Sequence, residues 1–350
     1  MTPIYFAVPG DLNSRTGGYI YDKRIIESLL SLDQFVEVMT LTGNFPFPSR
    51  EEKESAEQVF GNLPDGAVCV VDGLAFGALP EVAEHHGGRL VFIALIHHPL
   101  ALETGLTEAD KRRFFDNEKR TLRMARGIIT TSAHTASELQ PYGVAKDRIS
   151  VCIPGVDATR QAVGSQNNCT NLLCVATLTP RKGHDILIKS LAALRHRPWH
   201  LTCVGSVDRS PYTTKVIRDL INEMELEDCV HLVGECSEAE LSNHYHRSDL
   251  FVLASHYEGY GMAIAESLAR GVPVIATAAG AVKDTVPPKA GVIVPIGDQD
   301  ALTTALLAYF EDDTLRGSLV AGARASRDSF PTWDKAAATF LRALRKATEL

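Results

Sequence analysis

Two carboxylates in the second half of the chain, Glu258 and Glu266, stand with seven residues between them in the segment 249–277. An apolar run opens this segment and another closes it, and each is typical of a strand buried on both faces. Between the runs lie a glycine-rich loop and an apolar stretch that predicts a buried helix ending near Gly271. The segment therefore predicts a strand–loop–helix–strand unit of a parallel sheet, with one carboxylate in the loop and the other inside the helix.

A carboxylate inside a buried helix needs a partner, because burying an unpaired charge is costly. The side chain of Glu266 leans toward the helix N-terminus, about 7 Å along the axis from Gly261, so it can reach the carboxyl end of the preceding strand. Open α/β sheets bind ligands at that edge, and free N–H groups at a helix N-terminus bind phosphate. We therefore expect carboxylates that bind sugar hydroxyls beside a phosphate site, with the candidate residues Glu258, Gly259, Tyr260, Gly261, Met262 and Glu266. The alternative for Glu266 is a core glutamate paired to a backbone group or an arginine.

The whole block EGYGMAIAESLARGVPVIAT, which begins at Glu258, resembles the E-x7-E signature of family 4 glycosyltransferases. These are retaining enzymes with the GT-B fold, in which two Rossmann-like parallel-sheet α/β domains face each other across a cleft. The resemblance implies that Glu258 binds hydroxyls of the donor sugar and that Glu266 binds the ribose of the nucleotide.

Two adjacent cations, Arg181 and Lys182, lie in a TPRKG turn between a predicted strand and a predicted helix. Positive charge at such a turn would neutralise a departing nucleoside diphosphate. The turn resembles the basic donor-phosphate motif of the family, with Lys182 in the lysine position. Many members carry an arginine in a GRL-like triplet where this chain has Thr177, and Arg181 is the candidate to replace it. The alternative is two surface charges on a turn.

The first half of the chain offers a second candidate phosphate site. A predicted strand over 4–8 leads into a loop with Gly17 and Gly18 and then a helix over 19–32, although the full G-x-G-x-x-G pattern is missing. The resemblance places this glycine loop opposite the donor. The alternative is a tight turn without a ligand.

Polar residues end two predicted strands of the first half: Asp72 ends one, and His97 and His98 end the other. Side chains at strand carboxyl ends face the ligand crevice. His97 resembles the histidine that lies beside the donor sugar in this family, so we assign it to the catalytic residues with Arg181, Lys182 and Glu258. His98 is the alternative.

A helix predicted over 107–126 carries seven basic residues and a row of apolar ones. A basic amphipathic helix can bind an anionic membrane, and several members of the family act on lipid acceptors. Four acidic residues in the same helix offset much of the charge, which favours a solvated helix. Peripheral membrane contact therefore stays an alternative.

Length and composition fit two α/β domains. The chain has 350 residues, 45% hydrophobic and 22% charged, and its net charge of −8 disfavours a nucleic-acid partner. We expect an N-terminal acceptor-side domain of residues 1–160 with a returning C-terminal helix, 331–350, and a nucleotide-sugar-binding domain of residues 170–330. The polar segment 158–170 is the expected linker. With neither a membrane span nor a leader pattern, we expect a cytoplasmic protein.

Metal sites are not expected. The seven cysteines form no C-x2-C pair, and those in apolar runs, Cys174 and Cys203 among them, are interpreted as core residues. Asp298 and Asp300 form a D-x-D, which we interpret as a helix cap rather than a metal site.

The sequence thus predicts a retaining, metal-independent glycosyltransferase of the hexosyltransferase type (EC 2.4 class) that needs no cofactor. The nucleotide-diphosphate sugar is its donor, and the acceptor is a small molecule, a glycan or a lipid-linked compound. The alternatives are a nucleotide-sugar 2-epimerase-like isomerase, since some share the GT-B architecture, and a non-catalytic nucleotide-sugar-binding subunit, which the Thr177 substitution keeps open. The base and the sugar are not specified by the sequence.

Overall fold

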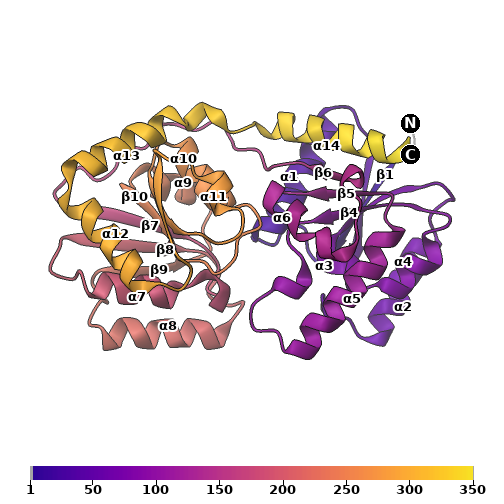
Figure 1. Cartoon of the computed structure of the whole chain (residues 1–350), viewed down its shortest axis with the longest axis horizontal. Helices are drawn as coiled ribbons and strands as arrows, with labels where there is room; N and C mark the ends of the chain where they lie inside the picture. Colours follow the sequence, from indigo (N-terminus) through magenta and orange to yellow (C-terminus); the bar gives the residue numbers. More distant parts are fainter. Residues whose placement is uncertain (1–2, 350) are drawn as a thin grey trace. The chain divides into compact units, whose positions relative to one another are not determined.

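The computed structural model describes residues 3–349, which form two compact units (Figure 1). Unit 1 comprises Met1–Gly155 and Pro331–Leu350, and unit 2 comprises Val156–Phe330. Each unit contains one six-stranded sheet, and all strand pairs in both sheets are parallel. Helical crossovers connect the strands, as the predicted alternation of strands and helices requires.

The sheet of unit 1 has the strand order β2-β1-β3-β4-β5-β6. Its strands are short apolar runs, and most of their residues are buried on both faces. The strands are β1 (Ile4–Pro9), β2 (Val36–Leu41), β3 (Val68–Asp72), β4 (Val91–Ile96), β5 (Gly127–Thr130) and β6 (Ile149–Val151). The helices are α1 (Gly17–Ser31), α2 (Arg50–Gly61), α3 (Gly73–Phe76), α4 (Pro80–His86), α5 (Glu108–Met124), α6 (Ala133–Glu138) and α14 (Trp333–Thr348).

The last helix of the chain, α14, packs on α1 and on strands β4 and β5 of unit 1. Its apolar face buries Trp333, Phe340 and Leu344, as the sequence predicts. Phe340 stacks on Phe6 of β1 with the ring centroids 6.2 Å apart. A side chain on Gly127 would lie 2.5 Å from Cβ of Ala347, so the helix approaches β5 closely. The C-terminal segment therefore completes the core of unit 1.

The sheet of unit 2 has the strand order β12-β11-β10-β7-β8-β9. The strands are β7 (Thr170–Val175), β8 (Trp199–Val204), β9 (Val230–Gly234), β10 (Leu250–Leu253), β11 (Val274–Thr277) and β12 (Gly291–Val294). The helices are α7 (His184–Ala192), α8 (Pro211–Glu223), α9 (Glu238–His246), α10 (Met262–Ala269), α11 (Val282–Thr285), α12 (Gln299–Glu311) and α13 (Asp313–Ala325). The expected strand–loop–helix–strand unit is β10, α10 and β11, and its two strands pair directly.

The segment expected to be a linker is part of unit 2. The backbone N–H of Ala162 donates to the carbonyl of Arg270 at 2.8 Å, and that of Ser165 donates to Asp249 Oδ1 at 2.9 Å. These bonds attach the polar stretch 156–170 to the rim of the second sheet, so the division between the units falls after Gly155. This stretch lacks hydrophobic periodicity because it has no regular secondary structure, although its backbone is hydrogen-bonded to unit 2.

Two predictions about helix starts can be compared with the structure. Asp298 caps α12, because its Oδ1 accepts from the N–H of Ala301 at 2.9 Å, which confirms the interpretation of the D-x-D as a cap. Gly17 and Gly18, expected in a loop, form the first turn of α1, which the bond from Ile20 N–H to the Thr16 carbonyl closes at 2.9 Å. Glycines in the first turn still leave the backbone open to a ligand.

Among residues 3–349 we find no helix that combines the length and the apolar character needed to cross a bilayer.

Helix α13 offers a matched test of how tightly unit 2 packs. A Cβ added at Gly322 would lie 1.9 Å from the Lys289 carbonyl, whereas one added at Gly317 has nothing within 4 Å. We expect Gly322→Ala to destabilise unit 2 by about 1–3 kcal/mol and Gly317→Ala to stabilise it by about 0.5–1 kcal/mol. Both changes in the free energy of unfolding can be measured by urea unfolding in a Trp333→Phe background. The fluorescence of Trp199 then follows the unfolding of unit 2. Equal effects of the two substitutions would contradict this packing.

Candidate active site

The basic turn and the first of the two glutamates meet at the carboxyl edge of the second sheet. Strands β7 and β10 are parallel neighbours, so the loops that follow them lie together. The turn after β7 forms a short 3₁₀ helix, η4 (Pro180–Lys182), and Glu258 lies in the loop after β10. Lys182 Nζ lies 2.6 Å from Glu258 Oε1. Ser255 Oγ donates to the same oxygen at 2.6 Å.

The Lys182–Glu258 pair is almost fully withdrawn from water, with 15% and 8% of the two side chains exposed. Burial opposes ionisation of Glu258, but the charges of Lys182 and Arg181 outweigh it and lower the pKa of the carboxyl group. Burial also lowers the pKa of Lys182, although Glu258 opposes that effect. The carboxylate is therefore held ionised by the cation beside it.

The main chains of the two loops are also joined. Arg181 Nη1 donates to the Tyr257 carbonyl at 2.9 Å, and the Arg181 carbonyl accepts from the N–H of His256 at 2.7 Å. Gly183 has φ +62°, and a Cβ there would lie 2.1 Å from the Ala254 carbonyl, so only glycine permits this approach. The geometry thus fixes both cations beside Glu258 before any ligand binds.

The second glutamate has a tyrosine as its partner. Tyr245 donates its hydroxyl to Glu266 Oε2 at 2.9 Å, and the Arg270 guanidinium lies over the Tyr245 ring at 4.4 Å from the centroid. Glu266 is half-buried, while its neighbours Ala265 and Ser267 are buried. The expected fully buried helix is therefore partly open at Glu266, as it also is at Met262 and Ala263, which disfavours the alternative of a core glutamate. Gly261, with φ +89°, stands at the N-cap of α10.

Unit 1 gathers a second cluster around His97, directly after β4. A Cβ on Gly18 would lie 3.2 Å from the His97 ring, so this glycine lies against the histidine, whereas a Cβ on Gly17 would have nothing within 4 Å. His97 Nε2 lies 3.0 Å from Asp22 Oδ1 and 3.3 Å from Asp72 Oδ2. The alternative histidine, His98, turns instead to Glu103, with 3.1 Å between Nε2 and Oε2. Of the two histidines, His97 is therefore the one that lies with Gly18 and the two aspartates.

The two aspartates keep His97 charged. Burial alone would lower the pKa of the ring, but Asp22 and Asp72 outweigh burial and raise it to about 10. Burial raises the pKa of Asp22, which His97 opposes, and Asp22 Oδ2 has no hydrogen-bond partner among the described residues. Both carboxylates are buried, whereas 19% of the His97 side chain is exposed. The cluster therefore presents an imidazolium at the edge of the sheet.

Sequence reasoning missed Asp22, Ser255 and Tyr245. Asp22 was detectable, because it lies four residues after Gly18 in the helix and so on the same face. Ser255 lies in the same loop as Glu258, three residues before it, and this short spacing was not recognised. Tyr245 gave no such signal, since it reaches Glu266 from a separate helix. Gly259, Tyr260 and Met262 lie in the predicted loop and helix start, with Tyr260 buried.

Comparisons with known proteins agree with this fold. Residues 156–326 match the family described as glycosyl transferases group 1, and residues 68–160 match glycosyltransferase family 4. A D-inositol 3-phosphate glycosyltransferase of Xylanimonas cellulosilytica is 29% identical over 252 residues, 66% of this chain and 60% of that protein. A GDP-mannose-dependent phosphatidylinositol monomannoside mannosyltransferase of Corynebacterium glutamicum is 27% identical over 81% of this chain and 74% of its own length.

Solved structures show the same fold over the whole chain. Sucrose-phosphate synthase from Thermosynechococcus elongatus superposes with a TM-score of 0.84 at 20% identity, covering 99% of this chain and 98% of that one. The Anabaena protein HepE, solved with UDP-glucose, gives 0.78 at 17% identity and covers 99% and 100%. The fold is therefore GT-B, the architecture of a large class of glycosyltransferase enzymes. The two family matches and the similar proteins together support a glycosyltransferase of the family 4 type.

The charge state of His97 can be tested directly. We expect Asp22→Asn to lower the pKa of His97, because it removes the nearer carboxylate. Ring ¹⁵N–¹H correlation spectra of ¹⁵N-histidine-labelled protein, recorded from neutral to alkaline pH, follow the loss of the proton. The control Asp116→Asn changes an exposed carboxylate on α5 and should leave the titration unchanged. A His97 titration that is the same in Asp22→Asn would refute the pairing.

Proposed function

We propose that the protein is a retaining glycosyltransferase that moves a sugar from a nucleotide-diphosphate sugar to an acceptor hydroxyl without a metal ion. The observation that carries this proposal is the buried pair of Lys182 and Glu258 at the carboxyl edge of the second sheet, with Arg181 beside it. A cation and a carboxylate fixed in this way can bind a phosphate and a sugar hydroxyl that are covalently linked to each other.

Each donor group has a place in this proposal. Lys182 and Arg181 bind the diphosphate, together with the amides at the start of α10. Glu258 accepts hydrogen bonds from the sugar hydroxyls, and Glu266, held by Tyr245, binds the ribose. The names of two similar proteins support a nucleotide-sugar donor, since HepE was solved with UDP-glucose and the Corynebacterium enzyme is described as GDP-mannose-dependent.

The proposed reaction needs no protein nucleophile. The bond from the anomeric carbon to the phosphate oxygen breaks, and the bond from the same carbon to the acceptor oxygen forms on the same face of the sugar. The acceptor proton passes to the leaving phosphate. Lys182 and Arg181 stabilise the charge that develops on the diphosphate, which is the largest contribution a preorganised site can make.

His97 is assigned to binding rather than to proton abstraction. An imidazolium donates hydrogen bonds and cannot accept a proton, and the two aspartates keep the ring in that form. We propose that it donates to a hydroxyl of the transferred sugar. Gly17 and Gly18 leave room beside the ring, since larger residues at position 18 would meet it.

The acceptor is a small molecule, a glycan or a lipid-linked compound in this proposal. Much of the basic charge of α5 is paired: Lys111 with Glu108, Arg113 with Asp110, and Arg120 with Glu81 and Glu84. Paired charges attract an anionic membrane weakly, so we infer that α5 is a solvated helix rather than a membrane-binding one.

Donor binding tests the site. We expect one of the UDP, GDP, ADP or dTDP sugars, at about a hundred times its dissociation constant, to add about 2.7 kcal/mol to the stability of the protein in a thermal-shift panel. The double variant Lys182→Ala/Glu258→Ala, which leaves neither charge buried alone, should bind that donor about 10- to 100-fold more weakly, since each lost charge-assisted bond contributes about 1.5–3 kcal/mol. It should also abolish transfer.

The matched control is Lys189→Ala, on the outer side of α7, where the lysine pairs with Asp185. It should bind the donor as the wild type does. If the double variant binds and transfers like the control, the site assignment fails. Incubation of the wild type with donor alone separates the alternatives: isomerised sugar indicates an epimerase, and tight binding without hydrolysis or transfer indicates a binding subunit.

A further inference from the structure

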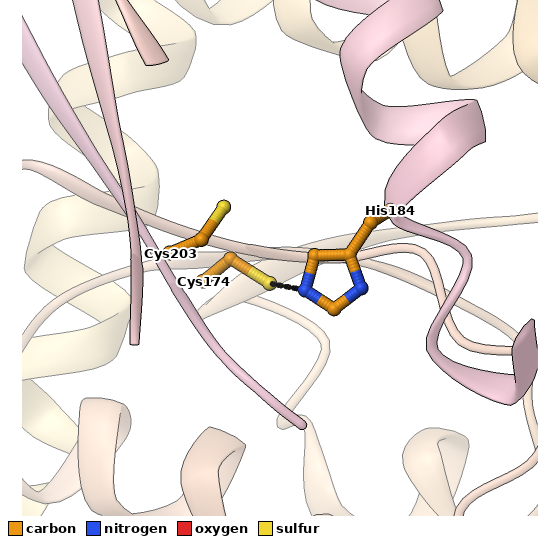
Figure 2. Close-up of side chains that lie close together, drawn as sticks. All are labelled: Cys174, His184 and Cys203. Atoms are coloured by element: carbon orange, nitrogen blue, oxygen red, sulfur yellow. Dashed lines mark hydrogen bonds between the residues drawn. The ribbon is translucent and has the colours of Figure 1, made fainter. Parts of the chain in front are cut away.

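Three side chains that can bind a metal lie together in the core of unit 2. Cys174 on β7 and Cys203 on β8 are partners in register, so their side chains lie on the same face of the sheet. His184, the first residue of α7, points its ring at the sulfur of Cys174 (Figure 2). Cys174 Sγ lies 3.8 Å from His184 Nε2, and the three candidate ligand atoms lie within 4.8 Å of one another.

Ordinary core packing accounts for the cysteines and leaves the histidine unexplained. All three residues are at most 2% exposed. The imidazole of His184 has a long contact with sulfur at one nitrogen, and its Nδ1 is buried without a hydrogen-bond partner among the described residues. Buried polar groups nearly always have a stronger partner than this. A bond from Nε2 to a metal ion would replace the long contact with sulfur at that nitrogen, and Nδ1 would then carry the ring proton.

The distance between Cys174 Sγ and His184 Nε2 suits a three-coordinate ion. With metal–sulfur and metal–nitrogen bonds of about 2.3 and 2.0 Å, a trigonal ion places sulfur and nitrogen about 3.7 Å apart, close to the 3.8 Å observed. Structural zinc takes four ligands, and the cluster offers three among the described residues. Thiolate ligands select soft ions such as Cu⁺.

We propose that Cys174, Cys203 and His184 bind one Cu⁺ ion, or an equivalent soft monovalent ion, in the core of unit 2. The ion would join β7, β8 and the start of α7. These elements flank the turn that carries Lys182, which is two residues before His184, so metal binding would stiffen the turn. The proposal stands independently of the donor and acceptor assigned above.

Another histidine cluster of the described chain does not meet the same conditions. Glu57, His85 and His86 lie within ligand distance of one another, but His85 is largely exposed. His86 Nδ1 accepts from Arg89 Nε at 3.1 Å, so its Nε2 carries the proton that faces Glu57 at 2.9 Å. A metal ion there would compete with two existing hydrogen bonds, whereas at His184 Nε2 it would replace one long contact with sulfur.

The test is an anaerobic titration of the reduced, full-length protein with Cu⁺ in the presence of a chromophoric Cu⁺ chelator. The partly exposed cysteines, Cys169, Cys229 and Cys236, are first alkylated in the native state, so that only buried thiols compete. We expect the wild type to withdraw one equivalent of Cu⁺ from the chelator and its unfolding temperature to rise. X-ray absorption should show two sulfur ligands and one nitrogen ligand.

Variants assign the ion to the cluster. Cys203→Ser, Cys203→Ala and His184→Asn should each weaken Cu⁺ binding at least tenfold and remove the rise in unfolding temperature. Cys69→Ser, which changes a buried cysteine of β3, should leave both unchanged. The two substitutions at Cys203 guard against loss of the fold, which circular dichroism checks without metal. Failure of the wild type to withdraw copper, unchanged binding in the Cys203 variants, or displacement of copper by equimolar Zn²⁺ would overturn the proposal.

Discussion

The buried ion pair of Lys182 and Glu258 is the constraint on which the candidate site depends. Two charges withdrawn from water are tolerated only if they meet at short range and have further hydrogen bonds, and here Ser255 supplies one. The pair requires β7 and β10 to be neighbours, and it requires glycine at two backbone approaches. At the second of these, a Cβ on Gly280 would lie 2.2 Å from the Glu258 carbonyl. The order of the strands, the geometry of the turns and the positions of the charges therefore depend on one another in this protein.

The pair also determines how a phosphate can bind. The ammonium of Lys182 has three donors, and Glu258 takes one of them at 2.6 Å. A diphosphate can bind the same cation without breaking the pair, so binding does not expose an uncompensated carboxylate. The site is preorganised in this sense: its charges are already placed and desolvated before the donor arrives, which lowers the reorganisation that the reaction requires.

The sequence predicts most of the fold and the second unit's site, for physical reasons that can be named. The α/β alternation is predicted by apolar runs of strand length and by the helix at 262–269, which glycines bound on both sides. The E-x7-E spacing locates both glutamates. Helix α13 was not predicted, since it buries little beyond Leu319 and Ala323. Asp22 did leave a spacing, four residues after Gly18, which was not used. Tyr245 was missed as the partner of Glu266, because a contact between separate elements leaves no spacing in the chain. The same reason hides the cluster of Cys174, His184 and Cys203.

The two units balance the charge of a largely buried cation with different numbers of carboxylates. Each places a cation at the carboxyl edge of a parallel sheet, where ligands of such sheets bind. In unit 2 one carboxylate balances Lys182, and Arg181 adds a second positive charge. In unit 1 two buried aspartates face the single charge of His97, and burial raises the pKa of Asp22, which reduces the negative charge of the cluster. A site with surplus positive charge suits the diphosphate of a donor, whereas a balanced imidazolium suits a neutral hydroxyl. These two charge balances are the reason for the roles proposed for the units: unit 2 binds the diphosphate, and His97 of unit 1 binds a hydroxyl.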